Sequence, residues 1–262
     1  MSPSPPASHP TVDRPSLASL FVQLSCAGQH LGTATGFLVE KGSSRFLITN
    51  RHVTSGRDHK DNIIDPNGRT PDQMTIWHHV AGQLGNWMAV TEDLYTPSGT
   101  PRWLEHPGHH HNVDVVALPL ENTSGWDAHS YNPWNQGPKV DQGVTLPLFI
   151  IGFPFGIAGG GFLGVWVQGT IASEPSLDWH DLPCFLIDSR TRPGQSGSPV
   201  IFYSRGGPVS FAPGSLSLSP ARFEQFVGVY SGRIHDKSDL GIVWKASVVR
   251  EIVDAAPPPP SP

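Results

Sequence analysis

A dozen short apolar runs, separated by turn signals, constrain the fold of this chain more than any other feature. The runs contain many Val, Ile, Phe and Trp residues, with Gly, Pro, Ser and Asn between them; they cover residues 18–26, 34–41, 44–50, 74–80, 86–92, 114–120, 145–153, 164–173, 184–189, 198–203, 225–232 and 241–246. Many short strands with frequent turns are typical of all-β barrels and sandwiches. One helical pattern follows, because Val248, Val249, Ile252 and Val253 share a face.

Charge and length narrow the class of protein further. The chain has 262 residues, a net charge of −5 and only 15% charged residues. This length is sufficient for one large or two small domains with an independent core. No basic stripe is present, so we expect no nucleic-acid partner.

The compartment is predicted from the cysteines and from an uncharged stretch. Cys26 and Cys184 do not make a disulfide framework, and we expect two free thiols. Residues 142–173 carry no charge, but Pro147, Pro154 and three glycines at 159–161 favour two buried strands over a membrane span. The first residues do not resemble a signal peptide. We therefore expect a soluble, cytoplasmic protein without membrane contact.

Both ends of the chain are rich in proline. Residues 1–15 and 255–262 are poor material for a core, and we predict disordered tails there. A partner with a proline-binding groove is the functional alternative to solvated tails. Between the tails we predict one folded region over residues 16–254.

The segment "TRPGQSGSPV", residues 191–200, places Ser196 on a tight turn before an apolar strand. Glycines at 194 and 197 permit a sharp backbone turn. The N–H groups of Gly194 and Ser196 can then point into one small hollow. A nucleophilic serine needs such donors, a base and a group that orients the base.

A base and an orienting acid are found upstream of this serine. His52 comes directly after the apolar run "RFLIT" and a turn, and Asp114 is embedded in the apolar segment "NVDVVALPL". A buried aspartate requires a hydrogen-bond partner, and a histidine N–H is a good one. The chain order is His52, Asp114, Ser196, which is the order of the chymotrypsin-type triad.

At this point the chain resembles the trypsin-like serine peptidases, and within them the HtrA/Deg-like bacterial branch. The resemblance rests on four segments in order: "ITNRHV", "DVVALPL", "IIGFPFGIAGGGFLGVWVQGTIAS" and "DSRTRPGQSGSP". It implies a chymotrypsin-like fold of two six-stranded antiparallel β-barrels, over about 16–125 and 144–254, with a short C-terminal helix. Few residues follow 254, so we expect no PDZ module.

The resemblance also implies roles for individual residues. Ser196 is the nucleophile, His52 the general base and then acid, and Asp114 the group that orients His52. The N–H groups of Gly194 and Ser196 form the oxyanion hole, and Ser231 supports Asp114. The implied activity is that of a serine endopeptidase that cleaves protein or peptide substrates through an acyl-enzyme, without metal or cofactor. The alternative is a non-catalytic binding or scaffold protein that keeps the same fold.

Substrate specificity stays open between two readings. The resemblance implies a primary pocket with Arg190 and Thr191 at its base and with walls from Ser231, Gly232, Arg233 and Gly241. Arginines beside a pocket favour an acidic substrate side chain, because guanidinium pairs with carboxylate in a two-pronged fork. The related peptidases instead imply a shallow apolar pocket for small aliphatic residues.

A histidine run precedes the aspartate, with His106, His109, His110 and His111 in "HPGHHHNVD". Such runs can bind zinc or nickel. A structural zinc site requires four ligands in a defined geometry, and the run by itself does not supply one. We therefore predict no metal site.

Overall fold

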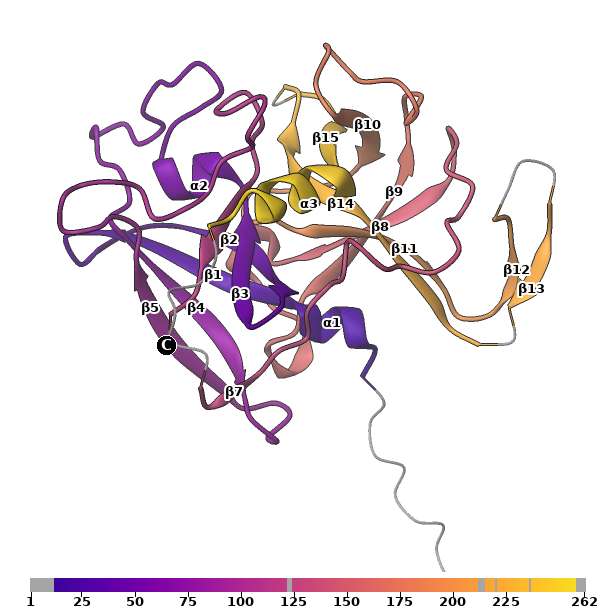
Figure 1. Ribbon diagram of the computed structural model, residues 1–262, viewed down its shortest axis with the longest axis horizontal. Helices are drawn as coiled ribbons and strands as arrows, with labels where there is room; N and C mark the ends of the chain where they lie inside the picture. The colour runs from indigo at the N-terminus through magenta and orange to yellow at the C-terminus, as the bar shows by residue number, and fades with distance from the viewer. Residues whose placement is uncertain (1–11, 122–123, 212–214, 220, 236, 258–262) are drawn as a thin grey trace, which may run out of the picture.

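The computed structural model describes residues 12–121, 124–211, 215–219, 221–235 and 237–257, which fold mainly into antiparallel strands (Figure 1). In chain order the elements are α1 (Arg14–Ala18), β1 (Ser19–Cys26), β2 (Gln29–Lys41), β3 (Ser44–Thr49), α2 (Arg51–Ser55), β4 (Gln73–Val80), β5 (Trp87–Asp93), β6 (Val116–Pro119), β7 (Trp126–Asp127), β8 (Pro147–Gly152), η1 (Pro154–Gly156), η2 (Gly160–Phe162), β9 (Val165–Ile171), β10 (Cys184–Ser189), β11 (Pro199–Ser204), β12 (Gly207–Val209), β13 (Ser217–Ser219), β14 (Phe223–Arg233), β15 (Leu240–Lys245) and α3 (Ala246–Asp254).

The N-terminal strands form one sheet in the order β5-β4-β1-β2-β3-β6, with β7 paired to β4. After β5 ends at Asp93, the chain continues to Leu104, which lies beside β6. There Leu104 and Ala117 of β6 exchange backbone hydrogen bonds of 2.8 and 3.1 Å. A single bridge therefore joins the two ends of the sheet in place of a full ladder.

The C-terminal strands form a closed barrel in the order β10-β15-β14-β11-β8-β9, and β9 pairs back onto β10. The hairpin of β12 and β13 projects from this barrel (Figure 1). The chymotrypsin-like, all-β fold predicted from the sequence is confirmed, and so is the C-terminal helix.

The central parts of β2 and β3, residues 36–39 and 46–48, are buried on both faces, which explains why these stretches contain no polar side chain. Side chains of a strand alternate between its two faces. Leu38 and Leu47 enter the core of the N-terminal sheet, whereas Phe37 and Ile48 enter a second core that also contains side chains of β8, β11 and β14. This shared core also receives the apolar face of α3, which lies against β6 and β14 (Figure 1). The shared core fixes the two sets of strands against each other.

Residues 12–15 belong to the folded structure, although the sequence placed them in a disordered tail. Asp13 accepts hydrogen bonds from the Tyr203 hydroxyl at 2.8 Å and from Arg205 at 2.7 Å. Arg14 donates to the carbonyl of Ser130 over 2.9 Å. The proline-rich composition of this segment did not indicate that Asp13 and Arg14 bind to the folded region. Residues 1–11 and 258–262 of the predicted tails lie outside the described residues.

Two further predictions concern the extent of the fold. The barrel boundaries near 125 and 144 stay a prediction, although strand pairing groups β1 to β7 apart from β8 to β15. In the described part of the chain no helix is long and apolar enough to span a membrane.

Candidate active site

The pairing of β3 with β6 brings two polar residues to the same edge of the N-terminal sheet. Thr49 at the end of β3 lies opposite Val116 at the start of β6. Because the strands are antiparallel, the residues after Thr49 meet those before Val116. His52 in α2 therefore lies beside Asp114. Asn50 strengthens the approach by donating its side-chain N–H to the Asp114 carbonyl over 2.6 Å.

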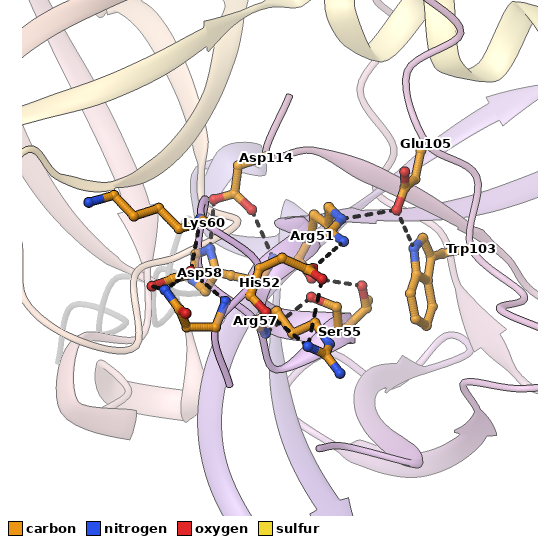
Figure 2. Close-up of polar contacts among 12 residues, drawn as sticks. Arg51, His52, Ser55, Arg57, Asp58, Lys60, Trp103, Glu105 and Asp114 are labelled. Carbon is orange, nitrogen blue, oxygen red and sulfur yellow. Dashed lines mark hydrogen bonds and ion pairs between the residues drawn. The ribbon is translucent and has the colours of Figure 1, made fainter. Parts of the chain in front are cut away.

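Asp114 holds His52 at two points (Figure 2). The distance from His52 Nδ1 to Asp114 Oδ2 is 2.6 Å, and the His52 backbone N–H donates to Asp114 Oδ1 over 2.8 Å. Burial alone would lower the pKa of His52, but the charge and the hydrogen bond of Asp114 raise it above its usual value. A carboxylate at Nδ1 selects the Nδ1–H tautomer, so the neutral ring presents Nε2 as a base.

Both parts of the fold contribute to this pair. Ser231, on β14 of the C-terminal barrel, donates its hydroxyl hydrogen bond to Asp114 Oδ2. Arg51 fixes α2 from the other side through Glu105 at 3.0 Å and Asp61 at 3.1 Å (Figure 2). The position of His52 is thus determined by contacts on both sides of its helix.

Ser196 lies on a turn between β10 and β11 that requires its two glycines. Gly194 and Gly197 have φ angles of +94° and +82°, in the left-handed region that side chains disfavour. A Cβ at Gly194 would lie 2.3 Å from the carbonyl oxygen of Phe153, and one at Gly197 would lie 2.1 Å from that of Thr35. Neither position has space for a side chain, so the turn packs directly against neighbouring backbone.

Two backbone N–H groups beside Ser196 point away from the protein's own acceptors. The Pro193 carbonyl accepts the N–H of Phe155 over 2.6 Å. The Gln195 carbonyl accepts the N–H of Ser198 over 3.0 Å. In a trans peptide the N–H points opposite to the carbonyl. Within the described residues the N–H groups of Gly194 and Ser196 have no hydrogen-bond acceptor. Both are available to an oxyanion.

The nucleophile candidate and the base candidate line one hollow, together with Ala34 and Val53. Ser196 Oγ makes a long contact of 3.5 Å to the carbonyl of Ser231. In the described part of the chain no hydrogen bond joins it to His52. Such bonds are often long or absent without substrate and form in the Michaelis complex.

Two of the residues predicted to surround the primary pocket, Thr191 and Gly241, lie against the ring of Tyr230. Thr191 is 1% exposed, and its hydroxyl is hydrogen-bonded to that of Tyr230, which is itself 2% exposed. A Cβ at Gly241 would lie 2.5 Å from the Tyr230 ring. The ring therefore fills the space between Thr191 and Gly241.

The predicted arginines differ in their surroundings. Arg190 is exposed. Arg233 and Gly232, which pair with β15, line a hollow beside His52 and Asp114. Two residues further along the chain, Arg192 lies 4.0 Å from Asp239.

The histidine run contributes a structural residue. His106 is 3% exposed, and its Nε2 lies 3.0 Å from Glu251 Oε2 on α3. Its Nδ1 accepts the backbone N–H groups of Gly108 and His109, each over 3.1 Å. Both ring nitrogens are thus engaged in hydrogen bonds. The described residues contain no group of three or more His, Cys, Asp or Glu side chains arranged to hold a metal ion.

The sequence matches the family described as the trypsin-like peptidase domain over residues 34–209. A search of curated protein sequences gives no significant match. Among solved structures, a thermostable serine protease, AL20, from an extremophilic microorganism has a TM-score of 0.53 at 12% identity, covering 93% of this chain and 98% of that one. The serine endoprotease from Yersinia pestis has a TM-score of 0.50 at 13% identity, covering 94% and 67%. The Rv3671c protease in its inactive form has a TM-score of 0.48 at 16% identity, covering 92% and 89%.

The family match spans more than half of the chain and includes the positions of His52, Asp114 and Ser196. The chain therefore belongs to the trypsin-like peptidase family. This membership assigns it to the serine endopeptidases, which act on protein or peptide substrates. The likenesses to the AL20 and Yersinia pestis proteases, at low identity, support the fold.

Sequence reasoning missed several residues that shape the site. Asn50 lay inside a quoted motif, but its bond to Asp114 depends on the strand register. Tyr230 looked like an ordinary strand aromatic. Thr35, which bonds the turn of Ser196, carried no signal because its partners are 118 and 159 residues away in the chain.

Proposed function

We propose that this chain hydrolyses peptide bonds with Ser196 as nucleophile, His52 as base and Asp114 as the group that orients His52. The observation that carries the proposal is the bond of 2.6 Å between His52 Nδ1 and Asp114 Oδ2, with Ser196 on the same hollow as His52. His52 Nε2 takes the hydroxyl proton while Ser196 Oγ attacks the scissile carbonyl.

The N–H groups of Gly194 and Ser196 receive the oxygen on which negative charge develops. Preorganised donors of this kind typically contribute a factor of about 10² to 10³ each to kcat. The protonated His52 then gives its proton to the departing amine, which leaves an acyl-enzyme ester on Ser196. A water molecule, deprotonated by His52, hydrolyses the ester and restores the hydroxyl.

We further propose that the primary pocket is shallow and takes small aliphatic side chains, as in the HtrA/Deg-like branch. The Tyr230 ring between Thr191 and Gly241 supports this reading, because it fills the depth that a long substrate side chain would need. The exposure of Arg190 weighs against an acidic preference set at that position. A peptide library tests this directly: cleavage after Ala, Val or Leu supports the proposal, and cleavage after Asp or Glu contradicts it.

The alternative of a non-catalytic binding protein is favoured by one observation, the contact of Ser196 Oγ with Ser231 in place of His52. A fluorophosphonate probe separates the two functions. We expect wild-type protein to be labelled at Ser196 between pH 7 and 8, and Ser196→Ala to remain unlabelled. Absence of labelling in folded wild-type protein at several pH values would favour the binding protein.

A further inference from the structure

We propose that Thr35 is a positioning residue for the proposed hydrolysis, holding the Ser196 turn in register with the sheet that carries His52. Thr35 lies on β2 of the N-terminal sheet and is 0% exposed. The Ser196 turn belongs to the C-terminal barrel. Thr35 therefore acts across the boundary between the two sets of strands.

The hydroxyl of Thr35 makes two hydrogen bonds at once. It donates to the Gly194 carbonyl over 2.8 Å and accepts the N–H of Phe153 over 3.1 Å. The Gly194 carbonyl belongs to the peptide between the two proposed oxyanion donors, so its orientation affects both of them. A Cβ at Gly152 would lie 2.6 Å from Thr35 Oγ1, which shows how closely backbone confines the hydroxyl.

The backbone of Thr35 extends the same connection to the base. Its N–H donates to the carbonyl of Ser196 over 2.9 Å, and its carbonyl accepts the hydroxyl of Thr49 over 2.8 Å. Thr49 is the last residue of β3, three positions before His52. A short chain of buried hydrogen bonds thus joins the strand that leads to the base with the turn that carries the nucleophile.

Removal of the hydroxyl has a predictable chemical consequence. Thr35→Val keeps the shape of the side chain but leaves the Gly194 carbonyl and the Phe153 N–H without their partner in a buried place. The peptide group between Gly194 and Gln195 is then free to rotate, and the N–H groups of Gly194 and Ser196 lose their alignment. Displacement of reacting groups by about 1 Å costs up to about 10²-fold in rate.

The test is a series of variants at Thr35 in the full chain, assayed with a peptide substrate. We expect Thr35→Val to lower kcat about 10- to 100-fold with KM changed by less than about threefold, because the donors act on the transition state. Thr35→Ser keeps the hydroxyl and is expected to retain kcat within about threefold. Ser19→Ala is the matched control, since it loses a buried hydroxyl that donates to the Ile151 carbonyl over 2.7 Å and does not bond to the turn or to Thr35. It is expected to retain kcat.

Wild-type kcat in Thr35→Val, or an equal loss in Thr35→Ser and Thr35→Val, would overturn the proposal. If the valine variant does not fold, Thr35→Cys takes its place with the same expectation, because a thiol is a weak hydrogen-bonding group.

The inference rests on the proposed function, and a second readout keeps the two separable. In ¹⁵N-labelled protein the amide signals of Gly194 and Ser196 report the turn without catalysis. We expect them to shift in Thr35→Val and to stay in place in Thr35→Ser and Ser19→Ala. Unchanged signals in Thr35→Val would refute the positioning role even in a preparation without activity. An inactive wild type with shifted signals in Thr35→Val would instead count against the peptidase function alone.

Discussion

His52 and Ser196 lie on the same hollow, but different kinds of contact hold them. The histidine is fixed through its own side chain, by the Asp114 carboxylate at 2.6 Å, which also accepts the hydroxyl of Ser231, while Asn50 bonds the backbone carbonyl of Asp114. The serine is fixed through the backbone around it, by bonds to the carbonyls of residues 193 to 196, while its hydroxyl makes only a 3.5 Å contact.

This difference is consistent with the roles proposed for the two residues. A base needs one tautomer and one ring orientation, which a charged side chain supplies. A nucleophile must change its bonding during the reaction, so the surrounding peptide planes need to be rigid while the hydroxyl stays free to turn. The comparison predicts that substitutions of the residues around His52 lower kcat by different amounts. Removal of the Ser196 hydroxyl, in contrast, abolishes nucleophilic attack.

The largest expected effect is that of Ser196→Ala. Loss of a triad nucleophile typically costs about 10⁶-fold in kcat. Among the described residues the hydroxyl makes a single long contact, so we expect the melting temperature to stay within a few degrees of wild type. Steady-state kinetics and thermal unfolding on the same preparation measure both quantities. Peptidase activity that persists in a clean preparation would remove Ser196 from its proposed role.

Asp114→Asn should cost less, about 10⁴-fold in kcat. The amide keeps the size of the side chain, but it no longer selects the Nδ1–H tautomer of His52. The rate of fluorophosphonate labelling should fall in parallel with kcat, because both need the base. A variant that labels at the wild-type rate would show that His52 does not depend on Asp114.

The same comparison explains what the sequence could reveal. His52, Asp114 and Ser196 stand in compact motifs of neighbouring residues, so their chain order and surroundings pointed to the site. The apolar runs pointed to an all-β fold because burial of strands leaves a local pattern. Thr35, Tyr230 and Asp13 act through partners far away in the chain, and such contacts depend on strand register and on side-chain packing across elements. Composition likewise placed residues 12–15 in a tail, because proline content does not report an ion pair between residues far apart in the chain.

Ser231→Ala is expected to have a smaller effect, about tenfold in kcat. The variant loses one hydrogen bond to the Asp114 carboxylate but keeps the backbone carbonyl near Ser196. A hydrogen bond to a charged group is worth about 1.5 to 3 kcal/mol, of which only part bears on the orientation of His52. Ser231→Thr keeps the hydroxyl and serves as the control. Equal losses in both variants would show that space, not hydrogen bonding, matters at this position.

The pH below which kcat/KM falls should be higher than the ordinary pKa of a histidine. In its proposed role as base, His52 acts only in its neutral form, and Asp114 raises the pKa of its ring. Protonation therefore begins at a higher pH than the ordinary value of 6.5. A profile of kcat/KM from pH 5 to 9 gives the midpoint directly, and a midpoint at or below 6.5 would contradict the role of Asp114.

The buried histidines His78 and His79 should behave in the opposite way and affect stability in place of activity. Burial lowers the pKa of each from 6.5 to about 4, because neither has a carboxylate partner like that of His52. Between pH 6.5 and 4 the unfolded chain binds protons that the folded chain does not, so the free energy of unfolding falls as pH falls.

At 1.36 kcal/mol per pKa unit this amounts to at most about 3 kcal/mol for His78. His78→Phe keeps an aromatic ring at the stacking distance of 4.1 Å from Trp126 and removes the titrating group. Denaturant unfolding at pH 7 and pH 5 should show a smaller loss of stability in this variant than in wild type. An equal loss would mean that other groups set the acid stability. Activity should therefore decline at a higher pH than stability does, since the charged partner raises one pKa and burial lowers the other.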